Sequence, residues 1–250
     1  MITFVTGATA GFGAAIARRF VREGHKVIAA GRRRERLEAL KAELGEAGWT
    51  VELDVRDREA VFAAFASLPR EFAEVDVLVN NAGLALGLET APSARLDDWD
   101  TMVDTNVKGL MYCTRAVLPG MVARDRGHIV NMGSVAAMYP YPGGNVYGAS
   151  KAFVHQFSLN LRADLNGTAV RVTDVQPGMC AGTEFSEVRF RGDAARASKV
   201  YEGVDAPLSA DDIADAVYWV ASRPSHVNVN AIEIMPVAQA FNAFKIDRRT

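Results

Sequence analysis

Near its start the chain reads Ile2-Thr-Phe-Val-Thr6-Gly7-Ala8-Thr9-Ala10-Gly11-Phe12-Gly13, an apolar run that enters a glycine-rich turn and then a helical pattern. A buried strand, such a turn and a helix N-terminus together present backbone N–H groups and the positive end of the helix dipole, which bind a pyrophosphate. The glycine spacing is GxxxGxG. The alternative is a tight turn that binds nothing. We predict a dinucleotide-binding loop formed by Gly7, Ala8, Thr9, Ala10, Gly11, Phe12 and Gly13.

The rest of the chain repeats this alternation of short apolar runs and longer segments of helical period. Strands are expected at 2–6, 25–30, 51–54, 75–79, 127–132, 169–175 and 231–235. Helices are expected at 13–23, 34–44, up to about 68, 96–121, 146–165 and 211–221. Apolar strands separated by helices predict an α/β fold with a doubly wound parallel sheet. We expect one domain over 1–250, with an aperiodic substrate loop at about 178–208.

Composition excludes several classes of protein. The 250 residues carry a net charge of −2, with 49% hydrophobic and 23% charged residues, which is typical of a folded protein without a nucleic-acid or membrane partner. No apolar stretch reaches the ~18 residues of a membrane span, and the N-terminus lacks a signal-peptide pattern. Two cysteines and four histidines show no metal-ligand spacing, so we expect no metal and a reducing cytoplasm.

The end of the second predicted strand indicates which dinucleotide binds. An NAD site would place Asp or Glu there to accept a hydrogen bond from the ribose 2′-hydroxyl. This chain instead reads Ala30-Gly31-Arg32-Arg33. Two guanidinium groups suit a 2′-phosphate, whereas the alternative, a solvated helix start, would set cations against the helix dipole. The sequence therefore predicts NADP(H) as cofactor, bound by Arg32 and Arg33.

Motifs along most of the chain resemble the short-chain dehydrogenase/reductase family. They are TGATAGFG at 6–13, LDV at 53–55, NNAG at 80–83, Asn106, GSVA at 133–136, YGASK at 147–151 and PG at 177–178. Within the family, NAGLALG, VLPGM, GGNVYGASKAF, 182–193 and HVNVN are most similar to bacterial NADP-dependent 3-hydroxy acid (serine) dehydrogenases. The resemblance implies a seven-stranded Rossmann-type sheet of order 3-2-1-4-5-6-7 and a homotetramer.

A pair of residues on one predicted helix carries the chemistry. Tyr147 and Lys151 lie four residues apart, so their side chains share one helix face. The positive charge of Lys151 is expected to favour ionisation of the phenol, which then acts as acid and base in hydride transfer. The resemblance adds Ser134, which hydrogen bonds to the substrate oxygen, and Asn106, which anchors a water linked to Lys151.

The resemblance also assigns further contacts with the cofactor. Asp54 and Val55 are expected to flank the adenine, and Asn81 to contact the ribose. The segment from Pro177 to Phe185 is expected to enclose the nicotinamide and the phosphates. The residues implied beyond the glycine-rich loop and the arginines are Asp54, Val55, Asn81, Ala82, Gly83, Tyr147, Lys151, Pro177, Gly178, Thr183 and Phe185. The chain departs from most members in one respect, because its threonine stands five residues beyond Gly178 rather than four.

The substrate is the least determined part of the prediction. Strand-like alternation at 189–191 would direct Arg189 and Arg191 to one side, where one of them binds an anionic group of the substrate. The alternative is that both pair with Glu184, Glu187 or Asp193. We expect an oxidoreductase acting on a small 3-hydroxy acid such as serine or 3-hydroxypropionate. The alternatives are a sulfoacetaldehyde reductase, a broad ketone or aldehyde reductase, and a cofactor-sensing regulator of the same fold.

Overall fold

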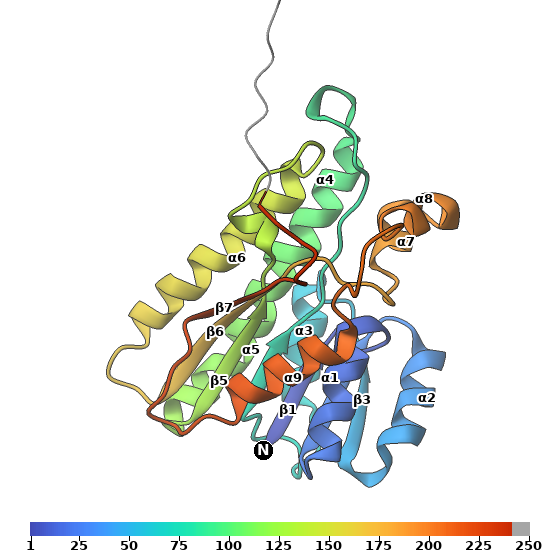
Figure 1. Cartoon of the computed structure of the whole chain (residues 1–250). Coiled ribbons are helices and arrows are strands. Elements are labelled where there is room, and N and C mark those ends of the chain that lie inside the picture. Colours follow the sequence, from blue (N-terminus) through green and yellow to red (C-terminus); the bar gives the residue numbers. More distant parts are fainter. Residues whose placement is uncertain (242–250) are drawn as a thin grey trace, which may run out of the picture.

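One parallel sheet runs through the computed structural model, which describes residues 1–241 (Figure 1). Its strand order is β3-β2-β1-β4-β5-β6-β7, as predicted. The strands are β1 (Ile2–Thr6), β2 (Lys26–Gly31), β3 (Gly48–Glu52), β4 (Val77–Asn80), β5 (Gly127–Met132), β6 (Val170–Pro177) and β7 (Ala231–Ile234). Because β1 pairs with both β2 and β4, the direction of winding reverses there. In open sheets of this kind the crevice at that point, at the carboxyl ends of the strands, is where ligands bind.

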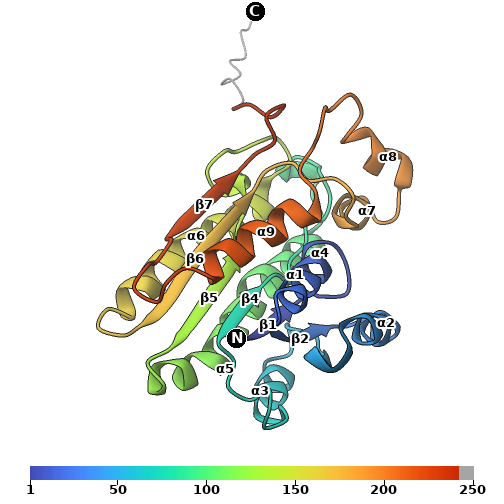
Figure 2. The same ribbon diagram turned by 60° about the horizontal axis from the view of Figure 1, so that its bottom comes forward.

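Helices cover both faces of the sheet. The longer ones are α1 (Gly11–Arg22), α2 (Arg34–Leu44), α3 (Arg58–Ala66), α4 (Leu96–Val103), α5 (Leu110–Ala123), α6 (Asn145–Asp164) and α9 (Ala210–Ala221). The shorter segments are η1 (Gly45–Ala47), η2 (Ala91–Ser93), η3 (Asp104–Gly109), η4 (Val135–Ala137), α7 (Phe185–Arg189) and α8 (Ala194–Lys199). Figure 2 shows α1 and α9 on one side of the strands and α3 and α5 on the other. Across residues 1–241, none of the helices combines the length and apolar character that a membrane crossing needs.

Two apolar cores lie between the sheet and these helices. Successive residues of β1 pack into different cores, because side chains along a strand point alternately to the two faces of the sheet. Val5 packs with Ile16 and Phe20 of α1 and with Val217 of α9. Its neighbour Phe4 packs with residues of α3, α5 and α6 on the opposite face. Burial on both faces explains why the strands of the sequence read as continuous apolar runs.

A buried hydrogen-bond network joins the centre of the sheet to two helices. The side-chain amide of Asn80 donates to Thr114 Oγ1 on α5 and to Asn131 Oδ1 on β5, both at 2.9 Å. The amide of Asn131 donates in turn to Ser158 Oγ on α6 at 2.8 Å. Buried hydrogen bonds that link several elements in this way restrict how those elements can be arranged. They fix α5 and α6 relative to the strand ends that carry the site.

Three elements differ most from the sequence predictions, and most of the other strands shift by one or two residues at their ends. Strand β3 ends at Glu52 rather than 54, and it begins earlier, at Gly48, because an edge strand does not need a continuous apolar run. The predicted helix 96–121 is interrupted by the π-helical turn η3. The segment 178–208 contains α7 and α8, which lie beyond the carboxyl ends of the strands (Figure 1). Helices of five and six residues are too short to show a helical period in the sequence. They depend on tertiary contacts for their stability, which the sequence pattern does not show.

Candidate active site

The glycine-rich turn between β1 and α1 is built by close backbone contacts. Gly7 and Gly11 have φ of 65° and 51°, which favours glycine. A Cβ on Gly13 would lie 2.4 Å from the carbonyl oxygen of Gly7, so only glycine lets α1 approach the turn. Asn81 holds the turn from β4, because its amide donates to Thr6 O at 2.9 Å and to Gly7 O at 3.2 Å.

The N-terminus of α1 suits an anion. Its N-cap is Ala10, whose side chain makes no capping hydrogen bond to the first-turn N–H groups. Those N–H groups carry the partial positive charge of the helix end. A phosphate group would satisfy them, so the local structure fits the pyrophosphate of a dinucleotide.

A cleft of about 340 Å³ runs along the carboxyl ends of the strands. Most predicted site residues line it: Gly7, Thr9, Ala10, Gly11, Phe12, Arg32, Arg33, Asp54, Val55, Asn81, Ala82, Gly83, Ser134, Tyr147, Lys151, Pro177, Gly178, Thr183 and Phe185. Residues that the sequence did not single out also line it: Gly31, Leu53, Leu84, Thr105, Met132, Gly133, Glu184 and Val188. Ala8 and Gly13 are buried behind the turn instead of facing the cleft, since they pack against the sheet and the loop itself.

At one end of the cleft, cations gather after β2. Arg33 donates from Nε and Nη2 to Thr9 Oγ1 at 3.1 and 2.9 Å, and from Nη1 to Glu184 Oε2 at 2.8 Å. The other oxygen of Glu184 accepts from Arg36. Arg33 and Arg36 share the carboxylate of Glu184, and Arg32 lines the same end of the cleft, so this end is rich in guanidinium charge. That charge fits a 2′-phosphate better than a ribose hydroxyl.

At the other end of the cleft lie Tyr147 and Lys151, both buried and one turn apart on α6. The ammonium of Lys151 donates to the carbonyl of Met132 at 2.7 Å and lies 5.8 Å from the centroid of the Tyr147 ring. Ser134 stands at the end of β5, where its hydroxyl caps η4 by accepting from Ala136 N at 3.1 Å. The carboxyl end of β5 and the first turns of α6 thus bring three predicted catalytic side chains together.

The fourth, Asn106, lies behind the cleft rather than on its surface. Its Oδ1 accepts from Leu84 N at 2.9 Å, and its Nδ2 donates to Leu84 O at 2.8 Å and to Ser150 Oγ at 3.0 Å. A Cβ on Gly83 would lie 3.3 Å from Asn106 Oδ1 and 3.5 Å from Lys151 Nζ. The amide and the ammonium therefore approach the same glycine, and the π-helical turn η3 places the amide there.

Burial controls the protonation of the two central groups. It raises the pKa of Tyr147 to about 12, although Ser134 and the guanidinium of Arg189 act in the opposite direction. Burial also lowers the pKa of Lys151 to about 8, and Asp174 offsets part of this change. The lowering of the phenol pKa by Lys151 that the sequence predicts is not found, because exclusion of water dominates and the ammonium is directed to a carbonyl. A protonated phenol suits a proton donor to a carbonyl oxygen.

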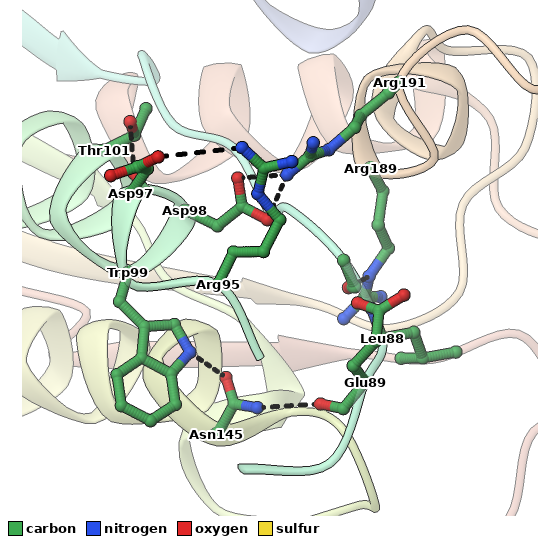
Figure 3. A network of polar contacts seen from close by, with 11 residues as sticks. Leu88, Glu89, Arg95, Asp97, Asp98, Trp99, Thr101, Asn145, Arg189 and Arg191 are labelled. Carbon is green, nitrogen blue, oxygen red and sulfur yellow. Dashed lines mark hydrogen bonds and ion pairs between the residues drawn. The ribbon is translucent and has the colours of Figure 1, made fainter. Parts of the chain in front are cut away.

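The two candidate substrate arginines diverge (Figure 3). Arg189 is the last residue of α7, and its Nε donates to Gly87 O at 3.1 Å and its Nη2 to the hydroxyl of Tyr141 at 2.6 Å. Its guanidinium lies 5.6 Å from the ring centroid of Tyr147. Arg191 instead contacts both carboxylate oxygens of Asp98 on α4 through Nη2. Neither arginine lines the cleft itself.

The expected strand-like alternation at 189–191 is therefore wrong. Arg189 is helical, and Arg191 has a left-handed φ of 56°, so the two side chains leave the backbone in different directions. Two of the three acids expected as their partners have other roles. Glu184 pairs with Arg33 and Arg36, and Asp193 caps α8 by accepting from Arg196 N at 3.0 Å.

Asp98 and Arg36 are the main residues that sequence reasoning missed. Glu184 falls within the predicted cofactor segment, but its pairing with Arg33 and Arg36 was also missed, because these arginines lie 151 and 148 residues away in the chain. Asp98 was missed for the same reason, since its partner is 93 residues away.

Comparisons with known proteins agree with this site. The family model described as short chain dehydrogenase matches residues 1–193. The chain is 64% identical to the NADP-dependent 3-hydroxy acid dehydrogenase YdfG of Salmonella typhi, over 99% of this chain and 100% of that protein. It is 55% identical to the serine 3-dehydrogenase of Agrobacterium fabrum, over 98% of each chain.

A solved structure is similar over the full length of both chains. It is the closed form of serine dehydrogenase complexed with NADP⁺, with 59% identity, a TM-score of 0.98 and 100% coverage of each chain. The chain thus belongs to the short-chain dehydrogenase/reductase family and is an NADP-dependent oxidoreductase.

Proposed function

We propose that the chain interconverts a small 3-hydroxy acid and its oxo form, with Tyr147 as acid and base. The names of its relatives, 3-hydroxy acid dehydrogenase and serine 3-dehydrogenase, support this substrate class. One observation in the chain itself carries the proposal. A half-buried guanidinium, that of Arg189, lies over the ring of Tyr147 and hydrogen bonds only to neutral groups. The ion pairs among residues 1–241 include none to Arg189, whereas Arg191 pairs with Asp98.

The proposed path of proton transfer is based on the geometry around the Tyr147 hydroxyl. In the reducing direction, Ser134 donates to the substrate oxygen and holds it beside Tyr147. The raised pKa of Tyr147 keeps the phenol protonated at neutral pH, so it gives its proton to the oxygen as negative charge develops there. Lys151 supplies positive charge one helical turn away. NADP(H), when bound, supplies or takes up the hydride.

The proposed cofactor contacts are inferred from where positive charge lies along the cleft. We infer that the turn 7–13 and the N-terminus of α1 hold the pyrophosphate, and that Arg32 and Arg33 hold the 2′-phosphate. The adenine then lies near Asp54 and Val55. The nicotinamide end is bordered by Asn81, Ala82, Gly83, Pro177, Gly178, Thr183 and Phe185.

Arg189, rather than Arg191, holds the anionic group of the substrate in this proposal. Arg191 already has a carboxylate partner in Asp98, so its charge is neutralised. Arg189 has no such partner among the ion pairs of residues 1–241, and its Nη1 makes neither of its two hydrogen bonds. A guanidinium beside the phenol would orient the substrate so that its carbonyl oxygen meets the hydroxyl groups of Ser134 and Tyr147.

Parallel kinetics test this function. Wild type and Arg189→Ala are assayed on L-serine, 3-hydroxypropionate, sulfoacetaldehyde and a neutral β-keto ester. Arg196→Ala is a matched control, because Arg196 of α8 stacks on Phe190, just after α7, and the contacts described for it do not include Tyr147 or Tyr141. We expect Arg189→Ala to lose ~10²-fold in kcat/KM on anionic substrates, from a charged hydrogen bond of about 3 kcal/mol, and little on the ester.

The same measurements separate the alternatives. Preference of the wild type for sulfoacetaldehyde would identify a sulfoacetaldehyde reductase. Preference for the ester, unaffected by Arg189→Ala, would identify a broad ketone reductase. NADPH binding without turnover of any carbonyl substrate would favour the cofactor-sensing regulator.

We also infer a homotetramer, which the family resemblance implies. Apolar side chains on α5 and α6 are partly exposed in the single chain, among them Met111, Val122 and Leu159. A partner subunit that covers them would remove this apolar surface from water. Light scattering at a fixed protein concentration measures the assembly mass, and a monomer mass would contradict the inference.

A further inference from the structure

An ion pair fastens the end of α7 to α4. Asp98 lies in the first turn of α4, where the helix dipole favours a carboxylate, and its side chain is only 12% exposed. Arg191, two residues beyond the end of α7, brings Nη2 against both of its oxygens. The backbone of Arg191 is left-handed, a conformation that non-glycine residues adopt only when their surroundings hold them there.

A second tether lies beside the ion pair. The N–H of Gly87 donates to the carbonyl of Arg189 at 3.0 Å, while Arg189 Nε donates back to the carbonyl of Gly87 at 3.1 Å. A Cβ on Gly87 would lie 3.7 Å from Asp98 Oδ2, so the two tethers are adjacent. Together they hold both the backbone and the guanidinium of Arg189.

Helix α4 is itself fixed to the helix that carries Tyr147. Trp99, next to Asp98, donates from its indole nitrogen to Asn145 Oδ1 at 3.1 Å. The amide of Asn145, the first residue of α6, donates to the carbonyl of Glu89 at 3.1 Å. Figure 3 shows this network spanning the segment around Glu89, α4 and the start of α6. A closed series of contacts therefore runs from α6 through α4 and Arg191 back to Arg189 above Tyr147.

We propose that Asp98 is a positioning residue, which acts through Arg191 to place the Arg189 guanidinium over Tyr147 for the anionic group of the substrate. The inference rests on the proposed role of Arg189 in holding that group. Asp98 touches neither Tyr147 nor Ser134, so its removal leaves the proton-transfer groups in place. The effect should therefore appear in KM for anionic substrates and spare the neutral ones.

The ion pair also determines which variants are informative. Only one guanidinium nitrogen of Arg191 contacts Asp98, so the single ammonium of Arg191→Lys retains the interaction. Arg191→Gly removes the side chain while accepting the left-handed backbone. Asp98→Asn removes the charge at nearly constant volume. Asp97→Asn is the matched control, because Asp97 is the adjacent acid, its side chain is 87% exposed and its nearest cation is Arg95 at 3.6 Å.

The test measures KM and kcat of each variant for a 3-oxo acid and for its methyl ester with saturating NADPH. Misplacing a reacting or orienting group by about 1 Å can cost ~10²-fold, so we expect Asp98→Asn and Arg191→Gly to raise KM for the acid by at least ~10-fold. Their KM for the ester and their kcat should stay within about two-fold of wild type. Arg191→Lys and Asp97→Asn should resemble wild type on both substrates. The acid-to-ester ratio is internal to each variant, so a reduced folded fraction does not affect it.

The outcomes separate this inference from the proposed function. If Arg189→Ala loses the acid selectively while Asp98→Asn does not, the positioning role of Asp98 is overturned and the anion site stands. Equal losses of Asp98→Asn on acid and ester would also overturn it, since they indicate a general effect on the loop. If Arg189→Ala discriminates between neither substrate, the anion site fails and the role of Asp98 fails with it.

Discussion

The buried charge of Lys151 makes the stability of the protein depend on pH in a defined direction. Burial lowers its pKa from 10.5 to about 8 in the folded chain. In the unfolded chain the pKa returns to its ordinary value. Between pH 8 and pH 10.5 the unfolded chain therefore binds more protons at this site than the folded chain does. Stability must rise with pH across that window, because the cost of burying the ammonium disappears as it loses its proton.

The size of the effect follows from the two pKa values. At ~1.4 kcal/mol per pH unit, the difference between 10.5 and about 8 corresponds to about 3 kcal/mol. Below pH 8 the full cost is present, and most of it is recovered by pH 10. The pKa of Tyr147 is raised to about 12, so the stability that Tyr147 contributes is lost only above pH 10. The range from pH 7 to pH 10 thus isolates Lys151 from its neighbour.

Urea unfolding of wild type, Lys151→Met and Lys151→Arg at a fixed protein concentration measures this change. Methionine does not titrate, and the arginine guanidinium stays protonated throughout the range. We expect the free energy of unfolding of wild type, relative to either variant, to rise by about 2–3 kcal/mol from pH 7 to pH 10. Parallel curves for the three proteins would show that the pKa of Lys151 is not lowered, and the reasoning from burial would be wrong.

Three further predictions concern catalysis and the cofactor. Tyr147→Phe should lower kcat by at least ~10²-fold while NADPH affinity, measured by fluorescence titration, stays unchanged; retention of a tenth of wild-type kcat would refute its role. Replacing Arg32 and Arg33 by alanine should weaken NADPH binding by roughly 1.5–3 kcal/mol per contact, whereas a matching loss for NADH would contradict the 2′-phosphate site. Gly13→Ala should abolish NADPH binding in the same titration, because its Cβ would lie 2.4 Å from the oxygen of Gly7.

The sheet was predictable because its strands are buried on both faces and therefore read as apolar runs. Strand β5 matched its prediction at both ends, from Gly127 to Met132. Strand β3 did not, since it lies at the edge of the sheet and its Trp49 is partly exposed. The strand order came from the family resemblance rather than from the pattern itself.

The position of the candidate site was predictable where its groups belong to local motifs, since Tyr147 and Ser134 do line one cleft. The separate roles of Arg189 and Arg191 were not, because they depend on Asp98, far away in the sequence, and on a five-residue helix. The direction of the Tyr147 pKa was missed for a related reason. Sequence spacing identifies a charged neighbour, but it does not show how completely the fold excludes water.

The contact between Glu184 and two arginines constrains any redesign of cofactor preference. An acid in place of Arg33, introduced to accept a ribose hydroxyl from NADH, would stand beside the carboxylate of Glu184 and repel it. Glu184 immediately precedes α7, the helix that ends in Arg189. A switch to NADH by that single exchange would thus also disturb the start of α7. Neutralising Glu184 in the same step would remove the repulsion, so the two positions have to be changed together.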